Sequence, residues 1–234
     1  MTLSLSPFWS YGEPPDVFIY PAKAAFNRVL PKAKIYANAK PSKSIKGKFV
    51  SQISEIVWKY KLSPDTTNLP SRDGFTEIQI FEIILKEPDI APEVLYVIDK
   101  VIPYPIFFRL LYEEQVKGVA AFKRPAADSS GKWVIEEYFE TDWADATTQV
   151  MPLPVALDLK AMYEQMLFAY INLQPRNGET LESLVERVRL IRKYQRGLQS
   201  IEGKMKSEKQ FNRKVELNAK IQSLKSDLAT LMKL

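Results

Sequence analysis

The fold is decided by the run EIQIFEIILK at residues 77–86. This run is short, rich in Ile and Phe, and bounded by turn residues on both sides, as is typical of a mostly buried strand. Only its ends and Glu82 carry charge. We therefore expect it to form a central strand of a sheet.

The sequence on either side of this strand predicts an α+β domain. Pro92 opens a helix whose apolar residues share one face, and turn residues separate the other elements. Glu136 and Glu137 interrupt the last strand, which favours an edge position. The predicted strands are 77–86, 104–112, 116–123 and 132–141, and the predicted helices are 21–30, 43–62, 92–102 and 162–173. Together they predict a single, mostly antiparallel sheet packed with helices.

A long helical segment follows a linker at Pro175-Arg176-Asn177-Gly178. We therefore expect an α+β domain over 1–175 and a basic helical extension over 176–234. Two apolar seams at heptad spacing need a partner helix, in the same chain or in a second copy. The seam residues are Leu181, Leu184, Val188, Ile191, Leu217, Ile221, Leu224, Leu228 and Leu231. The spacing changes between the seams, which favours a helical hairpin or a bent helix over one straight, coiled-coil-like rod.

Positive charge is concentrated in two parts of the chain. Residues 179–234 hold 13 Lys and Arg against 7 Asp and Glu, and residues 32–61 hold eight lysines against Glu55. Such clusters attract nucleic-acid phosphates, although a basic run can also be a solvated helix face. The candidate nucleic-acid-binding residues are Lys40, Lys43, Lys46, Lys48, Arg187, Arg189, Arg192, Lys193 and Arg196. No helix-turn-helix or zinc-finger pattern indicates sequence-specific recognition.

The chain contains neither histidine nor cysteine, which excludes several kinds of chemistry. Catalytic triads with histidine, thiolate nucleophiles and ordinary zinc or haem sites all need one of these residues. A magnesium-dependent nuclease remains the alternative function, but its Glu-x-Lys motif occurs only at Glu202-Gly203-Lys204, in the helical extension. Phosphate-binding glycine loops are also missing. We expect no catalytic residue, metal or cofactor.

Glu82 and Arg109 each interrupt an apolar strand. If the two strands are neighbours, a structural ion pair is favoured over a catalytic site, because one carboxylate and one guanidinium do not hold a metal. No stretch approaches the length of a membrane span, and residues 1–16 do not resemble a signal peptide. We expect a cytoplasmic protein.

Four stretches carry a family resemblance: IVWKYKLSPDTTNLP at 56–70, EIQIFEIILK at 77–86, VIDKVIPYPIFFRL at 97–110 and MPLPVALDLKAMYE at 151–164. The chain resembles, over roughly residues 30–230, a bacterial and archaeal family catalogued as a domain of unknown function. Members of that family tend to be encoded beside Swi/Snf-type helicases, DNA methyltransferases and restriction subunits. The resemblance thus implies, by association, a role in phage defence or restriction-modification.

These observations lead to a hypothesis about function. We expect a non-catalytic accessory subunit of a DNA-defence or restriction-modification system, whose C-terminal helices assemble with a helicase, a methyltransferase or a second copy of the chain. Direct, non-specific contact with DNA is the second part of this hypothesis.

Overall fold

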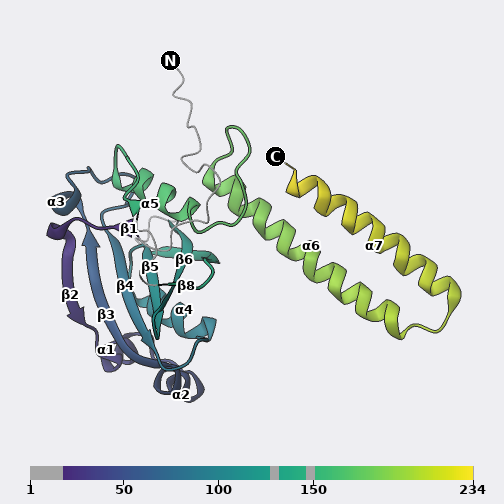
Figure 1. Cartoon of the computed structure of the whole chain (residues 1–234), viewed down its shortest axis with the longest axis horizontal. Coiled ribbons are helices and arrows are strands. Elements are labelled where there is room, and N and C mark those ends of the chain that lie inside the picture. Colours follow the sequence, from purple (N-terminus) through teal and green to yellow (C-terminus); the bar gives the residue numbers. More distant parts are fainter. Residues whose placement is uncertain (1–17, 127–131, 146–150, 234) are drawn as a thin grey trace. The chain divides into compact units, whose positions relative to one another are not determined.

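The computed structural model describes residues 18–126, 132–145 and 151–233 (Figure 1). The chain divides into two compact units, Met1–Asn172 and Leu173–Leu234. The first unit has the α+β fold that the sequence predicts, and the second consists of two long helices. The division between the units falls at Asn172, slightly before the linker at Pro175.

The described part of the first unit contains one seven-stranded sheet, which is mostly antiparallel. Its path runs β2 (Ala25–Val29), β3 (Ile53–Leu62), β4 (Ile78–Leu85), β5 (Ile106–Tyr112), β6 (Gln115–Pro125) and β7 (Trp133–Glu140), and β8 (Ala144–Asp145) pairs with β6. Only β4 and β5 among these pairs are parallel, and α4 (Pro92–Val101) connects them. The prediction of a central strand at 77–86 is confirmed, since β4 lies between β3 and β5 and is buried almost throughout. A separate pair joins β1 (Phe18–Ile19) to β9 (Met151–Pro152).

Helices cover both faces of the sheet. On one face, α1 (Lys32–Ala39), α2 (Lys43–Gln52) and α4 contribute to the main apolar core. The core contains Ile35 of α1, Phe49 of α2 and Val94 of α4, all of them buried. On the other face lies α5 (Leu159–Phe168), where the rings of Tyr163 and Phe107 meet at 6.0 Å between centroids. A short helix, α3 (Pro64–Thr67), follows β3.

One of the predicted helices is wrong, and a second is predicted ten residues too long. Residues 21–30 form a 3-10 turn at Ala22–Ala24 and then strand β2. The helix predicted for 43–62 ends at Gln52, where the chain continues directly into β3. Helical spacing could not locate this change, because Phe49, Ile53 and Ile56 are buried on either side of it. No apolar pattern indicated α1 either, because its only buried residue is Ile35.

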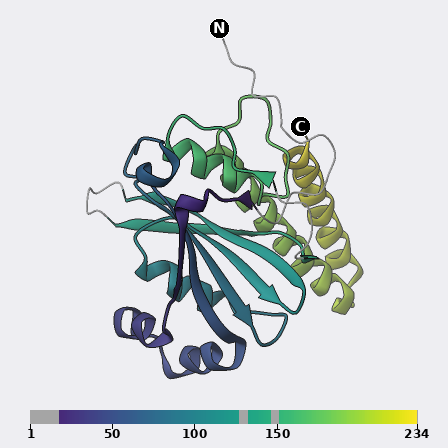
Figure 2. The same cartoon turned by 60° about the vertical axis from the view of Figure 1, so that its left-hand side comes forward.

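The second unit is a helical hairpin formed by α6 (Leu181–Ser207) and α7 (Phe211–Met232). The two helices lie side by side in Figures 1 and 2. Thr180 caps α6 by accepting a hydrogen bond from the Ser183 amide at 3.2 Å. Of the two alternatives that the sequence left open, a hairpin or a bent helix, the structure has the hairpin.

Candidate nucleic-acid interface

The first cluster of lysines lies where α1 passes into α2. Lys40 ends α1 in the left-handed conformation, with φ 46°, and Pro41 follows it. Ser42 then caps α2, because its hydroxyl accepts a hydrogen bond from the Ile45 amide at 3.3 Å. This tight junction brings lysines from both helices to one corner of the first unit.

Three lysines at this junction form what we call the α1–α2 basic surface: Lys40, Lys43 and Lys46. All three are exposed, and none has a carboxylate partner in the described part of the chain. Lys46 also lies over the ring of Tyr36, at 5.6 Å from the centroid. Lys48, the fourth candidate, differs because it is half-buried and contacts Glu93 at 3.3 Å. It is therefore not part of the surface.

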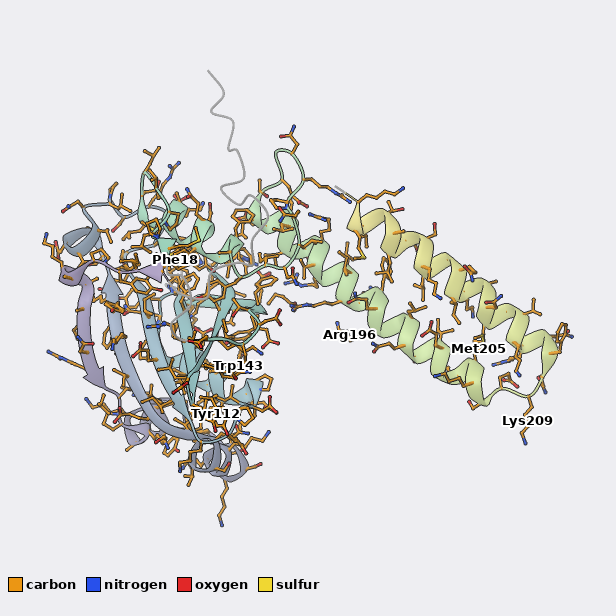
Figure 3. The ribbon with its side chains drawn as sticks, viewed as in Figure 1. Phe18, Tyr112, Trp143, Arg196, Met205 and Lys209 are labelled. Carbon is orange, nitrogen blue, oxygen red and sulfur yellow. The ribbon has the colours of Figure 1, made fainter. Side chains whose placement is uncertain are left out.

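The second cluster lies along α6, and we call it the α6 basic face: Arg189, Arg192, Lys193 and Arg196. Their spacing of three, four and seven residues puts all four on one side of the helix. Arg189 contacts Glu186 at 2.8 Å. Lys193 and Arg196 are exposed, and neither is in an ion pair within the residues described. Figure 3 labels Arg196 on α6.

Arg187 is also a predicted nucleic-acid residue, but the structure places it inside the hairpin. Its side chain is 4% exposed. The guanidinium contacts Glu179 through two nitrogens, at 2.8 and 2.6 Å, and donates to the carbonyls of Gln174 and Leu231. A buried guanidinium used in this way cannot reach a phosphate, so Arg187 lies outside the α6 basic face.

Arg176 works with Arg187 to close the hairpin. It donates to the carbonyls of Thr230 and Lys233, at 2.9 and 3.1 Å, at the C-terminus of α7. Positive charges there satisfy carbonyls that have no partner within the helix. Hydrogen bonds from Arg187, helped by the Arg176 amide, lower the pKa of Glu179. The linker predicted at Pro175 to Gly178 is thus partly a clamp at the base of the hairpin.

The predicted assembly seam lies largely between the helices of the hairpin. Leu181, Leu184, Val188 and Ile191 of α6 are buried, as are Ile221 and Leu228 of α7. The remaining seam residues, Leu217, Leu224 and Leu231, are half-buried. Much of the apolar surface of the two seams is therefore buried within this chain and is not available to a second copy.

The cations on the central strands of the sheet differ from the exposed lysines and arginines described above, because they have carboxylate partners. Every Lys and Arg side chain on strands β3 to β6 is in an ion pair with a carboxylate: Lys59 and Arg109 with Glu82, Lys61 with Glu77, Lys117 with Glu140, Lys123 with Asp99 and Arg124 with Glu136. Glu82 and Arg109 are direct partners in the β4–β5 register, and their Oε1 and Nη1 atoms lie 2.5 Å apart. The charge of Glu82 is thus shared between two cations.

Lys123 and Asp99 form a fully buried pair that the sequence analysis missed. Lys123 Nζ donates to Asp99 Oδ1 at 2.7 Å and to the carbonyls of Asp99, Ile102 and Tyr104 at 2.8 Å. The Tyr138 hydroxyl donates to Asp99 Oδ2 at 2.8 Å. Burial raises the pKa of Asp99 and lowers that of Lys123, and the attraction between them opposes both shifts. A lysine in an apolar strand and an aspartate in an apolar helix stripe were the signals that could have revealed it.

Carboxylates do not gather in the described part of the chain: no group of three or more Asp or Glu side chains there could hold a metal ion. Glu202 of the Glu-x-Lys run lies on α6 and contacts Lys225 of α7 at 3.7 Å. A pocket of about 300 Å³ opens between the sheet and the segment before α4, lined in part by Leu95, Tyr138 and Trp143. The two charges on its sheet side, Lys117 and Glu140, are paired with each other at 3.0 Å.

Comparison with known proteins shows the family to which the chain belongs. The chain is a member of the family described as Domain of unknown function (DUF4391), which it matches over residues 18–228. No curated protein and no solved structure matches it. In the ranges that the structure describes, no helix has the length and apolar character needed to cross a membrane.

Proposed function

We propose that the protein is a non-catalytic accessory subunit of a prokaryotic DNA-defence or restriction-modification system, and that it holds nucleic acid without reading its sequence. One observation supports the nucleic-acid part most strongly. The cations on strands β3 to β6 are in ion pairs, whereas Lys40, Lys43, Lys46, Lys193 and Arg196 are exposed without a carboxylate partner among the described residues.

The geometry of the α6 basic face suits a phosphate backbone. From Arg189 to Arg196 the helix rises by about 10 Å. Over that length each strand of a duplex presents about three phosphates. Long, flexible side chains on one face of a helix can follow such a row of charges, but they do not fix the hydrogen-bond pattern of a base. Binding should therefore be strong at low salt and insensitive to sequence.

The test is the affinity of the full chain for a labelled 20-base-pair duplex, measured by fluorescence anisotropy at several salt concentrations. We expect the double variant Lys193→Gln/Arg196→Gln to weaken binding and to reduce the salt slope by about one for each phosphate that the variant no longer neutralises. The triple variant Lys40→Gln/Lys43→Gln/Lys46→Gln tests the α1–α2 basic surface in the same way.

A matched control removes the same charge from lysines that have carboxylate partners. Lys48 contacts Glu93 and Lys59 contacts Glu82. The variant Lys48→Gln/Lys59→Gln should therefore lose less affinity than Lys193→Gln/Arg196→Gln. Equal losses would show that only net charge matters, and an affinity independent of salt would contradict the proposal.

Assembly is the second part of the proposal. Because the seam is largely used inside the hairpin, a partner would contact the outer surface of α6 and α7, where Val215 and Met232 are exposed apolar residues. Light scattering on the full chain tests for a homodimer, and Val215→Glu/Met232→Glu should convert such a dimer to a monomer. Co-expression with a helicase or methyltransferase encoded beside it tests the heteromeric alternative, and a full chain that stays monomeric and recovers neither enzyme would contradict this part.

A further inference from the structure

The turn of the helical hairpin combines exposed apolar side chains with positive charge. Phe211, the first residue of α7, is 77% exposed, and Val215, one turn later, is 54% exposed. Five exposed cations lie around the turn, within residues 204–215: Lys204, Lys206, Lys209, Arg213 and Lys214. None is in an ion pair in the described part of the chain. We call these seven residues the hairpin tip; Figure 3 labels Lys209 in the turn, with Met205 nearby on α6.

Glu208 is the only acid in this stretch, and the turn itself uses its carboxylate. Its Oε1 atom accepts hydrogen bonds from the amides of Lys209 and Gln210, at 2.8 and 2.9 Å. These hydrogen bonds, together with the charges of Arg213 and Lys214, lower the pKa of Glu208. The carboxylate therefore stays ionised while it fixes the turn, and the five cations remain available to an external anion.

Packing within the hairpin does not explain why Phe211 is exposed. A phenylalanine costs free energy in water, and a turn needs no aromatic residue at this position. Its spacing from Val215 puts both side chains on the same side of α7. The arrangement is one ring and one aliphatic side chain surrounded by cations, which is too little apolar surface to anchor a helix in a lipid interface.

An aromatic ring among cations is the arrangement that proteins use to hold single-stranded nucleic acid, where bases stack on the ring and phosphates meet the charges. A duplex keeps its base faces stacked on one another and offers Phe211 no such contact. We propose that the hairpin tip binds single-stranded nucleic acid, with a base stacked on Phe211 and the backbone on the five cations. This inference rests on the proposed function and specifies its ligand.

The test compares Phe211→Ala and Phe211→Trp in the full chain, with a labelled 20-nucleotide oligothymidine and a duplex of equal length. Phe211→Ala should weaken single-strand binding about tenfold, because stacking on an aromatic face accounts for that much affinity per base. Phe211→Trp keeps an aromatic face and should bind the single strand as tightly as the wild-type chain. Duplex binding should change less than twofold. Tyr96→Ala is the matched control, since Tyr96 of α4 is an aromatic side chain that is 44% exposed and does not belong to the hairpin helices.

The possible outcomes separate this inference from the proposed function. If the wild-type chain binds neither oligonucleotide, both fail. If it binds both and Phe211→Ala changes neither affinity, or lowers both equally, only the inference is overturned. Vesicles containing phosphatidylserine form a third arm, and Phe211-dependent binding to them without oligonucleotide binding would assign the tip to a lipid surface. Far-UV circular dichroism should show unchanged helicity in each variant, as expected for an exposed position.

Discussion

On the sheet of the first unit, Lys59 and Arg109 share Glu82, and Lys123 is enclosed with Asp99. Along the hairpin of the second unit, Lys193 and Arg196 reach no carboxylate in the described part of the chain. The difference follows from burial, because a charge removed from water needs a partner, whereas an exposed cation is stabilised by water. Positive charge thus has a structural role in the sheet and remains available to a ligand on the hairpin.

Removing one partner of the buried pair should have the largest effect. Asp99→Ala leaves the ammonium group of Lys123 buried without its carboxylate, so we expect a loss of about 3–5 kcal/mol in unfolding free energy. Urea unfolding followed by tryptophan fluorescence measures this loss in the first unit, because all four tryptophans precede residue 144. The double variant Asp99→Leu/Lys123→Met should be less destabilised than the single one. A loss below about 1 kcal/mol would show that the pair does not stabilise the sheet.

A tight contact beside the Glu82–Arg109 pair should give the next largest effect. Gly118 lies opposite Arg109 in the register, and a Cβ atom there would come within 2.5 Å of the Tyr170 ring. Gly118→Ala should therefore cost up to about 3 kcal/mol, by the same fluorescence measurement. Gly47→Ala is the control, because nothing lies within 4 Å of its added atom and alanine favours a helix. Equal stability of the two variants would mean that Tyr170 moves aside.

The clamp at the base of the hairpin is where charge does stabilise the second unit. Glu179→Gln replaces a buried carboxylate that binds Arg187, so we expect a loss of about 2 kcal/mol, measured by the helical signal in circular dichroism. Because folding lowers the pKa of Glu179, its contribution is present above the ordinary glutamate pKa of about 4.3 and is lost as the pH falls through the folded-state pKa. The wild-type hairpin should lose stability on acidification, and Glu179→Gln should lose less. Identical acid profiles would contradict this assignment.

The exposed cations of α6 should matter least to stability. Lys193→Ala and Arg196→Ala should each change the unfolding free energy by less than about 0.5 kcal/mol, since neither side chain has a protein partner in the described residues. Urea unfolding followed by circular dichroism measures this change. A larger loss would mean that these cations support the hairpin, and the contrast between the two units would then disappear.

Local sequence was sufficient to predict a helix or a strand where the spacing of apolar residues fitted only one of the two. The buried run 77–86 became β4, Pro92 opened α4, and the heptad seams became the packed faces of α6 and α7. It was insufficient around Ile53, because residues that fit both a helical stripe and a strand are buried in either case. Tertiary pairing with β4 on one side and β2 on the other makes this segment a strand.

The α+β class, the helical extension and the concentration of positive charge along the chain could all be read from the amino-acid sequence, because they depend on composition and on the spacing of apolar residues. Which charges are paired became known only from the folded chain. Arg187 belongs to a basic run in the sequence, yet it closes the base of the hairpin with Glu179. Lys123 and Asp99 are far apart in the sequence and meet only because α4 packs on β6. A charge acquires its partner from folding, and no local pattern records that partner in advance.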